Sequence, residues 1–329
     1  MSICQRILAA AALTLVALTV AAGAHAQGGA AYPTRPLKLI VPFPPGGGAD
    51  LTARTLAQKM GDAMGQPIVV DNRPGANGLI GTDLVAKAAP DGYTILLVDR
   101  GALGINPSLY AKLPYDPLRD FAYIGIATEG PYVLVVNPAL PAKTLAELVA
   151  LAKAKPGSIN YASYGIGSMA QLNLEALNQR LGIDLQHVPY KGAGPAVTAV
   201  VAGEVGVTIA SVPGVLGFVR DGRARALAVG SDKRLALFPD VPTMAEAGGG
   251  DTLIPTFFAL AAPAGTPPAV VAKLNAELKR ALAAPDVAER LIAAGLVPIG
   301  GSPEMMAATV RQDVTRFAAL VKAIGIKPE

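Results

Sequence analysis

The amino-acid sequence predicts an α/β protein, and two observations support this class. Strand-length apolar runs alternate with helical segments from about residue 37 to residue 229, and such repeats form mostly parallel sheets covered by helices. The alternation stops near Leu253, beyond which three helical segments follow with one short strand-like run between them. With 329 residues, the chain is long enough for two domains of ordinary size or for one large domain.

The N-terminal 26 residues have the pattern of a secretory signal peptide. Arg6 supplies a positive charge, Ile7–Val20 is apolar, and Ala24-His25-Ala26 is a small-residue cleavage site. An uncleaved membrane anchor is the alternative, but the apolar stretch is short for a stable span. Cys4 is the single cysteine and precedes the apolar stretch, whereas a lipoprotein cysteine would follow it. We therefore expect an exported, periplasmic protein without disulfides or lipidation.

Composition argues against several functional classes. Cleavage after Ala26 removes one arginine and no acid, so the formal net charge falls from +4 to +3, and no basic stripe typical of nucleic-acid binding is present. His187 is then the one remaining histidine, which excludes a zinc site or a Cys–His pair, and we expect it to be structural. No G-x-S-x-G or Walker A sequence occurs. No catalytic residue, metal or cofactor is expected.

The N-terminal block begins with a strand over Leu37–Pro42 and a helix over Asp50–Met64. Leu51, Leu56 and Met60 fall roughly on one helical face, and Gly65 is a stop signal. The next expected elements are a strand over Pro67–Asp71, a helix over Leu79–Ala89 and a strand over Tyr93–Val98.

The middle block repeats this order. Thr144 and Glu147 form a capping box at the start of a helix over Leu145–Lys155. The remaining expected elements are strands over Tyr132–Val136, Ile159–Ala162, Leu185–Val188, Val205–Ile209 and Ala224–Val229, and helices over Met169–Leu181, Pro195–Ala202 and Val215–Arg220. The C-terminal part is expected to contain an apolar run over Leu253–Ala261, helices over Val270–Ala283, Val287–Ala294 and Pro303–Ala323, and a short strand over Leu296–Ile299.

The first strand leads into the turn PFPPGGGADLTAR, residues 42–54, which is suited to bind an anion. Pro44 and Pro45 restrict φ and donate no backbone hydrogen bond, whereas Gly46, Gly47 and Gly48 allow a ligand to approach the backbone. The N–H groups and partial positive charge at the start of the next helix favour negative charge. The alternative is a plain turn in which Asp50 caps the helix.

A second turn of similar design follows the strand over Ile159–Ala162. Gly165 and Gly167 free the backbone, and Ser168 is placed to cap a helix or to bind a ligand oxygen. The turn also matches G-x-G-x-x-A, with Asp184 downstream, but Tyr164 would crowd a pyrophosphate and an exported protein has little access to NAD. Two anion-binding turns on separate βα blocks indicate a cleft between domains and favour a binder over a catalyst.

Tyr190 and Lys191 follow the strand over Leu185–Val188, at a carboxyl end where α/β sheets bind ligands. Lys191 could face an anion or be a solvated loop lysine.

Several longer strings carry a resemblance to a known family. They are Tyr32-Pro33-Thr34-Arg35-Pro36, Val41-Pro42-Phe43-Pro44-Pro45-Gly46-Gly47, Asp71-Asn72-Arg73-Pro74-Gly75-Ala76, Pro90-Asp91-Gly92-Tyr93, Asn106-Pro107-Ser108-Leu109-Tyr110, Leu113-Pro114-Tyr115-Asp116-Pro117, His187-Val188-Pro189-Tyr190-Lys191-Gly192 and Ala262-Pro263-Ala264-Gly265-Thr266-Pro267. From about Tyr32 to Ile324 the chain resembles the extracytoplasmic solute receptors of tripartite tricarboxylate transporters, the Bug family.

The resemblance implies a type II periplasmic-binding-protein fold, in which two α/β domains close on a ligand. It places residues 27–129 and 252–329 in a discontinuous domain 1 and residues 130–251 in domain 2. It implies a small carboxylate held between the two glycine turns, partly through water, and delivery to membrane transporter subunits by a monomeric receptor. The residues expected to contact the ligand are Phe43, Pro44, Gly46, Gly47, Asp50, Asn77, Arg100, Tyr164, Gly165, Gly167, Ser168, Tyr190 and Lys191.

The sequence departs from the family pattern at several positions. Asn77 stands where glycine is usual, Gln171 where histidine is common, and Ala199 and Gly206 replace frequent acidic residues. These changes concern the ligand rather than the fold.

Asp99 and Arg100 occupy a stretch that is usually made of small polar residues. In an extended strand only one of the two can face the ligand. Arg100 would bind a second carboxylate and favour a dicarboxylate, whereas Asp99 would favour an amine. In a third reading, Arg100 lies on the surface and pairs with an acid such as Asp120.

Two other functions remain open on sequence alone. One is an exported enzyme acting on a small anion in the same cleft, and the other is a sensor for a signalling partner. For a receptor, the breaks in the βα pattern predict hinges near Ala127–Pro131 and Thr252–Pro255.

Overall fold

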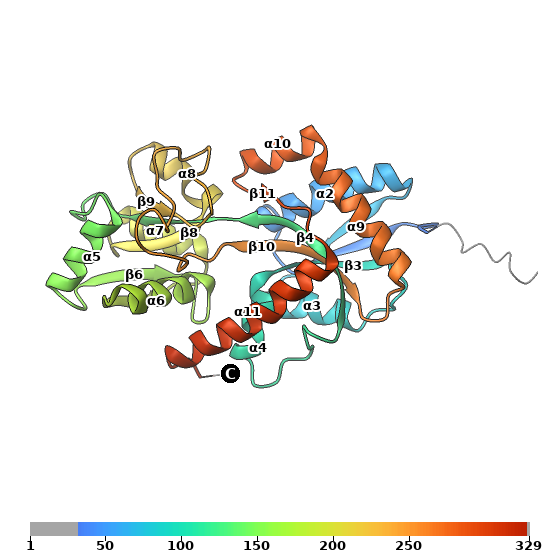
Figure 1. Cartoon of the computed structure of the whole chain (residues 1–329), viewed down its shortest axis with the longest axis horizontal. Helices are drawn as coiled ribbons and strands as arrows, with labels where there is room; N and C mark the ends of the chain where they lie inside the picture. The colour runs from blue at the N-terminus through green and yellow to red at the C-terminus, as the bar shows by residue number, and fades with distance from the viewer. Residues whose placement is uncertain (1–31, 328–329) are drawn as a thin grey trace, which may run out of the picture.

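The protein forms two α/β lobes that lie side by side along its long axis (Figure 1). The computed structural model describes residues 32–327, so the predicted signal peptide lies outside the described residues. Each lobe is built around one sheet with helices on its faces. Within residues 32–327, no helix has the length and apolar character needed to cross a bilayer.

The first lobe contains a six-stranded mixed sheet. Its strand order is β11 (Val297–Pro298), β4 (Phe121–Gly130), β10 (Thr256–Pro263), β3 (Thr94–Asp99), β1 (Leu37–Val41) and β2 (Ile68–Asn72). Strand β1 pairs in parallel with β2 and β3, as the βα repeats predict. Strand β10 returns from the second lobe and inserts antiparallel between β3 and β4. The expectation of a mostly parallel sheet is therefore wrong for this half of the lobe.

Alternate side chains of the central strands pack against opposite helical layers. Leu39 and Leu97 join the core on one face, whereas Ile40, Leu96 and Val98 join the core on the other. Near-continuous apolar strands are what a sheet covered on both faces requires. The helices of this lobe are α2 (Gly48–Met64), α3 (Leu79–Ala86), α4 (Asn106–Leu109), α9 (Pro268–Ala283), α10 (Pro285–Ala293) and α11 (Pro303–Ala323).

The second lobe contains a five-stranded sheet. Its order is β7 (Leu185–Pro189), β6 (Ile159–Ser163), β8 (Val207–Ser211), β5 (Tyr132–Val136) and β9 (Arg225–Val229). Strand β6 is parallel to β7 and β8, whereas β5 is antiparallel to β8 and β9. The helices are α5 (Leu145–Ala154), α6 (Met169–Leu181), α7 (Ala193–Ala202) and α8 (Val212–Arg220). Thr144 caps α5 by accepting a hydrogen bond from Glu147 N, as predicted.

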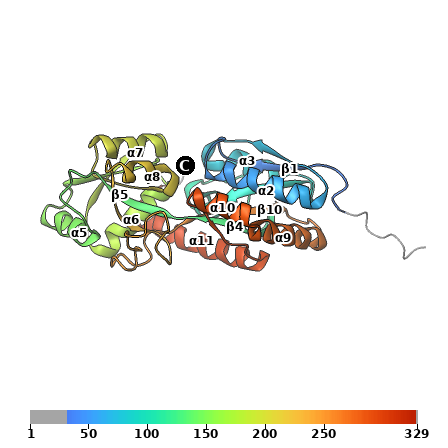
Figure 2. The same cartoon turned by 90° about the horizontal axis from the view of Figure 1, so that it is seen from above.

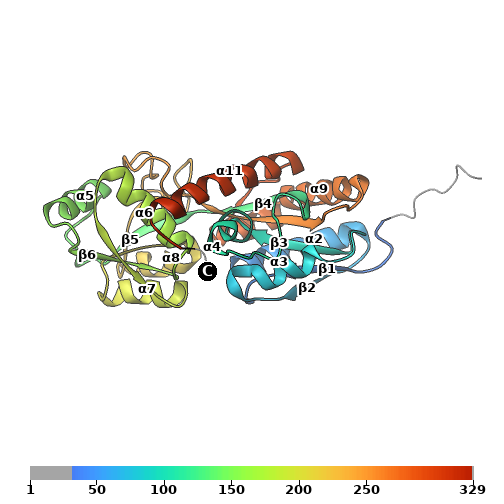
Figure 3. The ribbon, with the colours of Figure 1, turned by 90° about the horizontal axis from the view of Figure 1, so that it is seen from below.

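The chain connects the lobes in three places. It passes from β4 to β5 through Pro131, returns to β10 through residues 230–255, and extends helix α11 from the first lobe onto the second. Phe317 and Val321 of α11 belong to the same apolar core as Leu134 and Leu172 of the second lobe. The views from above and below show β4 running between the lobes and α11 lying along one side of the junction (Figures 2 and 3).

Candidate functional site

A cavity of about 170 Å³ lies between the two lobes. Its walls come from both, which is the arrangement expected of a site that closes on a ligand. From the first lobe it is lined by Phe43, Asn77, Asp99, Gly101, Ile105, Asn106 and Leu109, and from the second by Tyr132, Tyr164, Gly167, Ser168 and Met169. Several of these residues follow the carboxyl ends of β1, β3 and β6, where α/β sheets usually bind ligands.

Asp50 shapes the first glycine turn. Helix α2 begins at Gly48 with Gly47 as its N-cap, so the alternative in which Asp50 is the N-cap is wrong by three positions. The buried Asp50 carboxylate instead accepts hydrogen bonds from Gly46 N at 3.0 Å, Arg54 Nε at 2.9 Å and Asn72 Nδ2 at 3.0 Å. Burial opposes ionisation, but these hydrogen bonds lower the pKa of Asp50 overall. Asp50 does not line the cavity.

The backbone of this turn is open to solvent. Gly46 has φ of +89°, and an added Cβ at Gly46 or Gly47 would meet no atom within 4 Å. Phe43 lines the cavity and packs edge-on against Phe258 of β10, with ring centroids 6.4 Å apart. Pro44, Gly46 and Gly47 are exposed and lie outside the lining, so their contact with a ligand remains a prediction.

The second glycine turn faces the cavity directly. Ser168 caps α6 by accepting a hydrogen bond from Gln171 N, and Gly167 N donates to Gln171 Oε1 at 2.7 Å. An added Cβ at Gly167 would lie 2.5 Å from Leu109 Cδ1, so this turn of the second lobe touches α4 of the first. Tyr164 is fixed by donating its hydroxyl hydrogen to Ile209 O at 2.5 Å. The N-terminus of α6 thus borders the cavity.

Two asparagines form part of the first-lobe wall. Asn77, which sequence analysis singled out, adopts φ of +50° in the left-handed region that asparagine tolerates. Its carbonyl accepts a hydrogen bond from Asn106 Nδ2 at 3.2 Å, and Asn106 also contacts the hydroxyl of Tyr115. Asn106 is not among the residues that the sequence predicts to contact the ligand. Its available signal was its place in the family string Asn106-Pro107-Ser108-Leu109-Tyr110.

The structure places Asp99, and not Arg100, in the lining of the cavity. Asp99 ends β3, and its carboxylate accepts a hydrogen bond from Ala102 N at 2.8 Å, in the π-helical turn Gly101–Ile105. Burial raises the pKa of Asp99 to about 6, although backbone hydrogen bonds and the charge of Arg100 oppose the rise.

The prediction that Arg100 faces the ligand is therefore wrong. Arg100 is 7% exposed, and its Nη1 atom lies 2.8 Å from Oδ1 of Asp313 on α11. Its guanidinium also lies over the ring of Phe257, 4.9 Å from the centroid. The alternative pairing with Asp120 is also wrong, because the partner comes from the C-terminal helix.

The remaining predicted residues lie outside the lining. Gly165 is on the second turn, Tyr190 is half-buried, and Lys191 is exposed. Sequence reasoning missed Gly101, Ile105, Tyr132 and Met169. The crossing at Pro131 was the available signal for Tyr132, because a residue that follows an interdomain crossing lies near the cleft.

Ser163 and His187 form a hydrogen bond, with 2.6 Å between Oγ and Nε2. Such a pair resembles a nucleophile with its base. However, Ser163 is fully buried and also hydrogen-bonds to Gly165, while His187 stacks on Tyr161 with 5.0 Å between centroids. Burial lowers the pKa of His187. Neither residue lines the cavity, so the pair fixes the second turn and His187 has the structural position that was expected.

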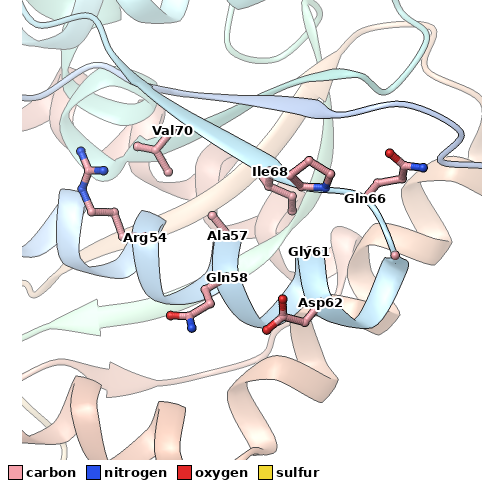
Figure 4. Close-up of a pocket in the computed structure, with 10 residues that line it drawn as sticks. Arg54, Ala57, Gln58, Gly61, Asp62, Gln66, Ile68 and Val70 are labelled. Atoms are coloured by element: carbon pink, nitrogen blue, oxygen red, sulfur yellow. The ribbon is translucent and has the colours of Figure 1, made fainter.

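A second depression lies on the outer side of the first lobe, between α2 and the edge strand β2. Figure 4 shows Arg54, Gln58 and Asp62 of α2 beside Ile68 and Val70 of β2. Its lining comes from this lobe alone and includes neither glycine turn. The cavity between the lobes is therefore the better candidate for a ligand site.

Comparison with known proteins identifies the family. The profile described as "Tripartite tricarboxylate transporter family receptor" matches residues 52–326. The chain belongs to this family. BugT from Bordetella pertussis, one of its relatives, is 40% identical over 323 residues, which is 98% of both chains. Family membership makes the chain a solute-binding receptor rather than an enzyme.

Solved receptor structures share the fold. The periplasmic binding protein BugD is 35% identical with a TM-score of 0.76, over 91% of this chain and 100% of BugD. MatC from Rhodopseudomonas palustris with bound malate is 34% identical with a TM-score of 0.75, over 88% of this chain and 100% of MatC. The resemblance to the Bug family and the periplasmic-binding fold that it implied are thus confirmed.

Proposed function

We propose that the cavity between the lobes captures a small carboxylate in the periplasm and that the loaded receptor delivers it to membrane subunits of a tripartite transporter. The observation that carries this proposal is the second glycine turn, which presents Gly167, Ser168 and the N-terminus of α6 to a cavity walled by both lobes. A helix N-terminus with free N–H groups favours an anion. The malate bound by MatC is of the same chemical class.

The cavity provides polar groups without a cationic side chain. Asn77, Asn106 and the hydroxyls of Tyr132 and Ser168 offer hydrogen bonds, and within residues 32–327 no lysine, arginine or histidine lines the cavity. Backbone N–H groups and the α6 dipole would therefore supply most of the attraction for the carboxylate. We place Phe43 and Tyr164 against its apolar part, and expect closure to bring Gly46 and Gly47 to the ligand.

The proposal includes the domain organisation expected from sequence. Residues 27–129 and 252–329 form one domain and residues 130–251 the other, with hinges at Ala127–Pro131 and Thr252–Pro255. Support comes from the two separate sheets and from the chain crossings between them. Export by a signal peptide cleaved after about Ala26 and action as a monomer complete the proposal.

The test compares two serine caps. Ser168 caps α6 at the cavity, and Ser302 caps α11 in the same way by accepting a hydrogen bond from Met305 N. Loss of either cap should cost about 1 kcal/mol of folding free energy. We expect Ser168→Ala alone to weaken acid binding, by about tenfold or more, because a hydrogen bond to a charged group is worth about 1.5–3 kcal/mol. Titration calorimetry with malate, succinate, aspartate and 3-aminopropanoate measures the affinities.

Gly47→Val tests the first turn in the same titrations. An added Cβ at this position meets no protein atom within 4 Å, so we expect little effect on folding and a lower affinity when the lobes close. A plain turn without a binding role would leave the affinity of Gly47→Val unchanged. Equal affinity losses in Ser168→Ala and Ser302→Ala, or no binding of any of the four acids, would overturn the proposed function.

A further inference from the structure

Asp99 brings an unusual charge to the cavity. Of the twelve residues that line it in the described part of the chain, Asp99 is the one with a side chain that ionises near neutral pH, since the two tyrosines remain neutral. Burial raises the pKa of Asp99 to about 6, so the carboxylate is charged above that pH. A receptor for anions thus carries a negative charge inside its own binding cavity.

No cationic side chain of the cavity wall compensates this charge. Arg100 is adjacent in sequence, but its guanidinium points to α11 and is paired with Asp313 at 2.8 Å. The other ionisable groups near Asp99 are the hydroxyls of Tyr115 and Tyr132, and burial raises the pKa of both. The Asp99 carboxylate is also held by backbone hydrogen bonds, of which the one from Ala102 N is 2.8 Å long.

We propose that the ligand carries an ammonium group that pairs with Asp99, while its carboxylate lies against the N-terminus of α6. This inference rests on the proposed function and narrows its ligand class to amino-carboxylates. A second carboxylate on the ligand would face Asp99 as a like charge, which is destabilising at short range in a partly buried site. An ammonium group in the same place supplies a counter-charge from within the cavity and up to three hydrogen-bond donors.

The alternative role of Asp99 is purely structural, as a cap for the turn Gly101–Ile105. An asparagine side chain also has an oxygen that accepts the Ala102 hydrogen bond, so capping does not require the charge. Asp99→Asn therefore keeps the cap and removes the negative charge, which separates the two roles. Glu129→Gln is the matched control, because Glu129 is a partly buried acid that feels the charge of Arg100, as Asp99 does, but does not line the cavity.

The experiment uses two pairs of ligands that differ mainly in charge. Aspartate has an ammonium group where malate has a hydroxyl, and 3-aminopropanoate has one where succinate has its second carboxylate. Calorimetric titration of the wild-type protein at pH 7.5 should show the amino member of each pair binding about tenfold or more tightly. Asp99→Asn should remove this preference, and Glu129→Gln should retain it.

Two results would overturn the inference while leaving the proposed function intact. One is wild-type affinity for malate and succinate equal to or above that for their amino counterparts, and this comparison needs no variant. The other is an unchanged preference in folded Asp99→Asn, with thermal melting as the check of folding. If Ser168→Ala still weakens binding of malate or succinate in either case, carboxylate capture stands and the ammonium proposal fails. If none of the four acids binds, both proposals fail.

Discussion

Arg100 and Asp313 form a buried ion pair that joins β3 to α11. One hydrogen bond of 2.8 Å links them, while the Nε atom of Arg100 and the Oδ2 atom of Asp313 are buried without a partner. Burial lowers the pKa of Arg100 and raises that of Asp313, and in each case the charge of the partner opposes the shift. The hydrogen-bonding capacity of the pair is therefore only partly satisfied. The pair stabilises the fold mainly because it spares each residue from burying its charge without a counter-charge.

Replacing one residue of the Arg100–Asp313 pair should lower the free energy of unfolding more than replacing both. We expect Arg100→Met or Asp313→Leu to lower the free energy of unfolding by about 3–5 kcal/mol, because each leaves an unpaired buried charge. The double variant should recover much of that loss, since two apolar side chains can fill the site. Urea unfolding at pH 7 measures all three. Strictly additive losses in the double variant would contradict this account.

The buried position also changes what Arg100 does for binding. Because its guanidinium points away from the cavity, a preference for dicarboxylates cannot come from it. The charged residue that lines the cavity is the preceding one, Asp99. If Arg100 lined the cavity, we would expect a dicarboxylate ligand. Because Asp99 lines it instead, we expect a ligand with an amine.

At the scale of elements, helix α11 holds the two lobes together. Met306 and Val310 in its first half belong to a core of the first lobe, whereas Phe317 and Val321 in its second half belong to the core of the second. Arg316 of the same helix pairs with Asp251 near the second crossing, at 3.1 Å. The helix therefore contributes packing energy to both lobes.

Truncation of Phe317 should expose this role. We expect Phe317→Ala to lower the free energy of unfolding by about 3–5 kcal/mol, because the side chain is fully buried and leaves a cavity. Gln312→Ala, on the exposed face of the same helix, should change it by less than about 0.5 kcal/mol. Urea denaturation followed by circular dichroism compares the two. A loss for Phe317→Ala no larger than that for Gln312→Ala would argue against the bridging role.

At the scale of the whole molecule, we expect the two lobes to close around the cavity. The lobes have separate sheets, and a second space of about 420 Å³ remains between Ser231–Leu237 and Ile292–Ile299. The lobes already touch where Gly167 meets Leu109 and where Gly295 meets Val212. Helix α11 limits opening on its side of the junction, so we expect movement about the crossings near Pro131 and residues 252–255.

Ligand binding should make the molecule more compact. Small-angle X-ray scattering with and without a saturating acid from the calorimetric panel should show a smaller radius of gyration in the bound state, because closure reduces the distance between the lobes. An unchanged radius at saturation, with binding verified by calorimetry on the same sample, would remove the hinge from the proposal.

Local sequence patterns were sufficient for much of this protein. Alternating apolar runs predicted α/β architecture, and Thr144, Ser168 and Gly65 marked helix ends that the structure contains. Of the two predicted glycine turns, the one after β6 borders the cavity between the lobes, and the family strings led to the correct fold. These features could be predicted because periodicity, capping and turn chemistry depend on residues close together in the chain.

Tertiary structure alone decided which side chains meet. The insertion of β10 between β3 and β4 required pairing of strands more than a hundred residues apart in sequence. Arg100 and Asp313 are separated by 213 positions, so no local pattern could join them. The facing of Asp99 depended on where β3 ended and the π-helical turn began, because one residue of register exchanges the inward and outward side chains. The sequence alone thus determined the class of protein and the positions of its two glycine turns, whereas long-range packing determined which charge lines the cavity between the lobes.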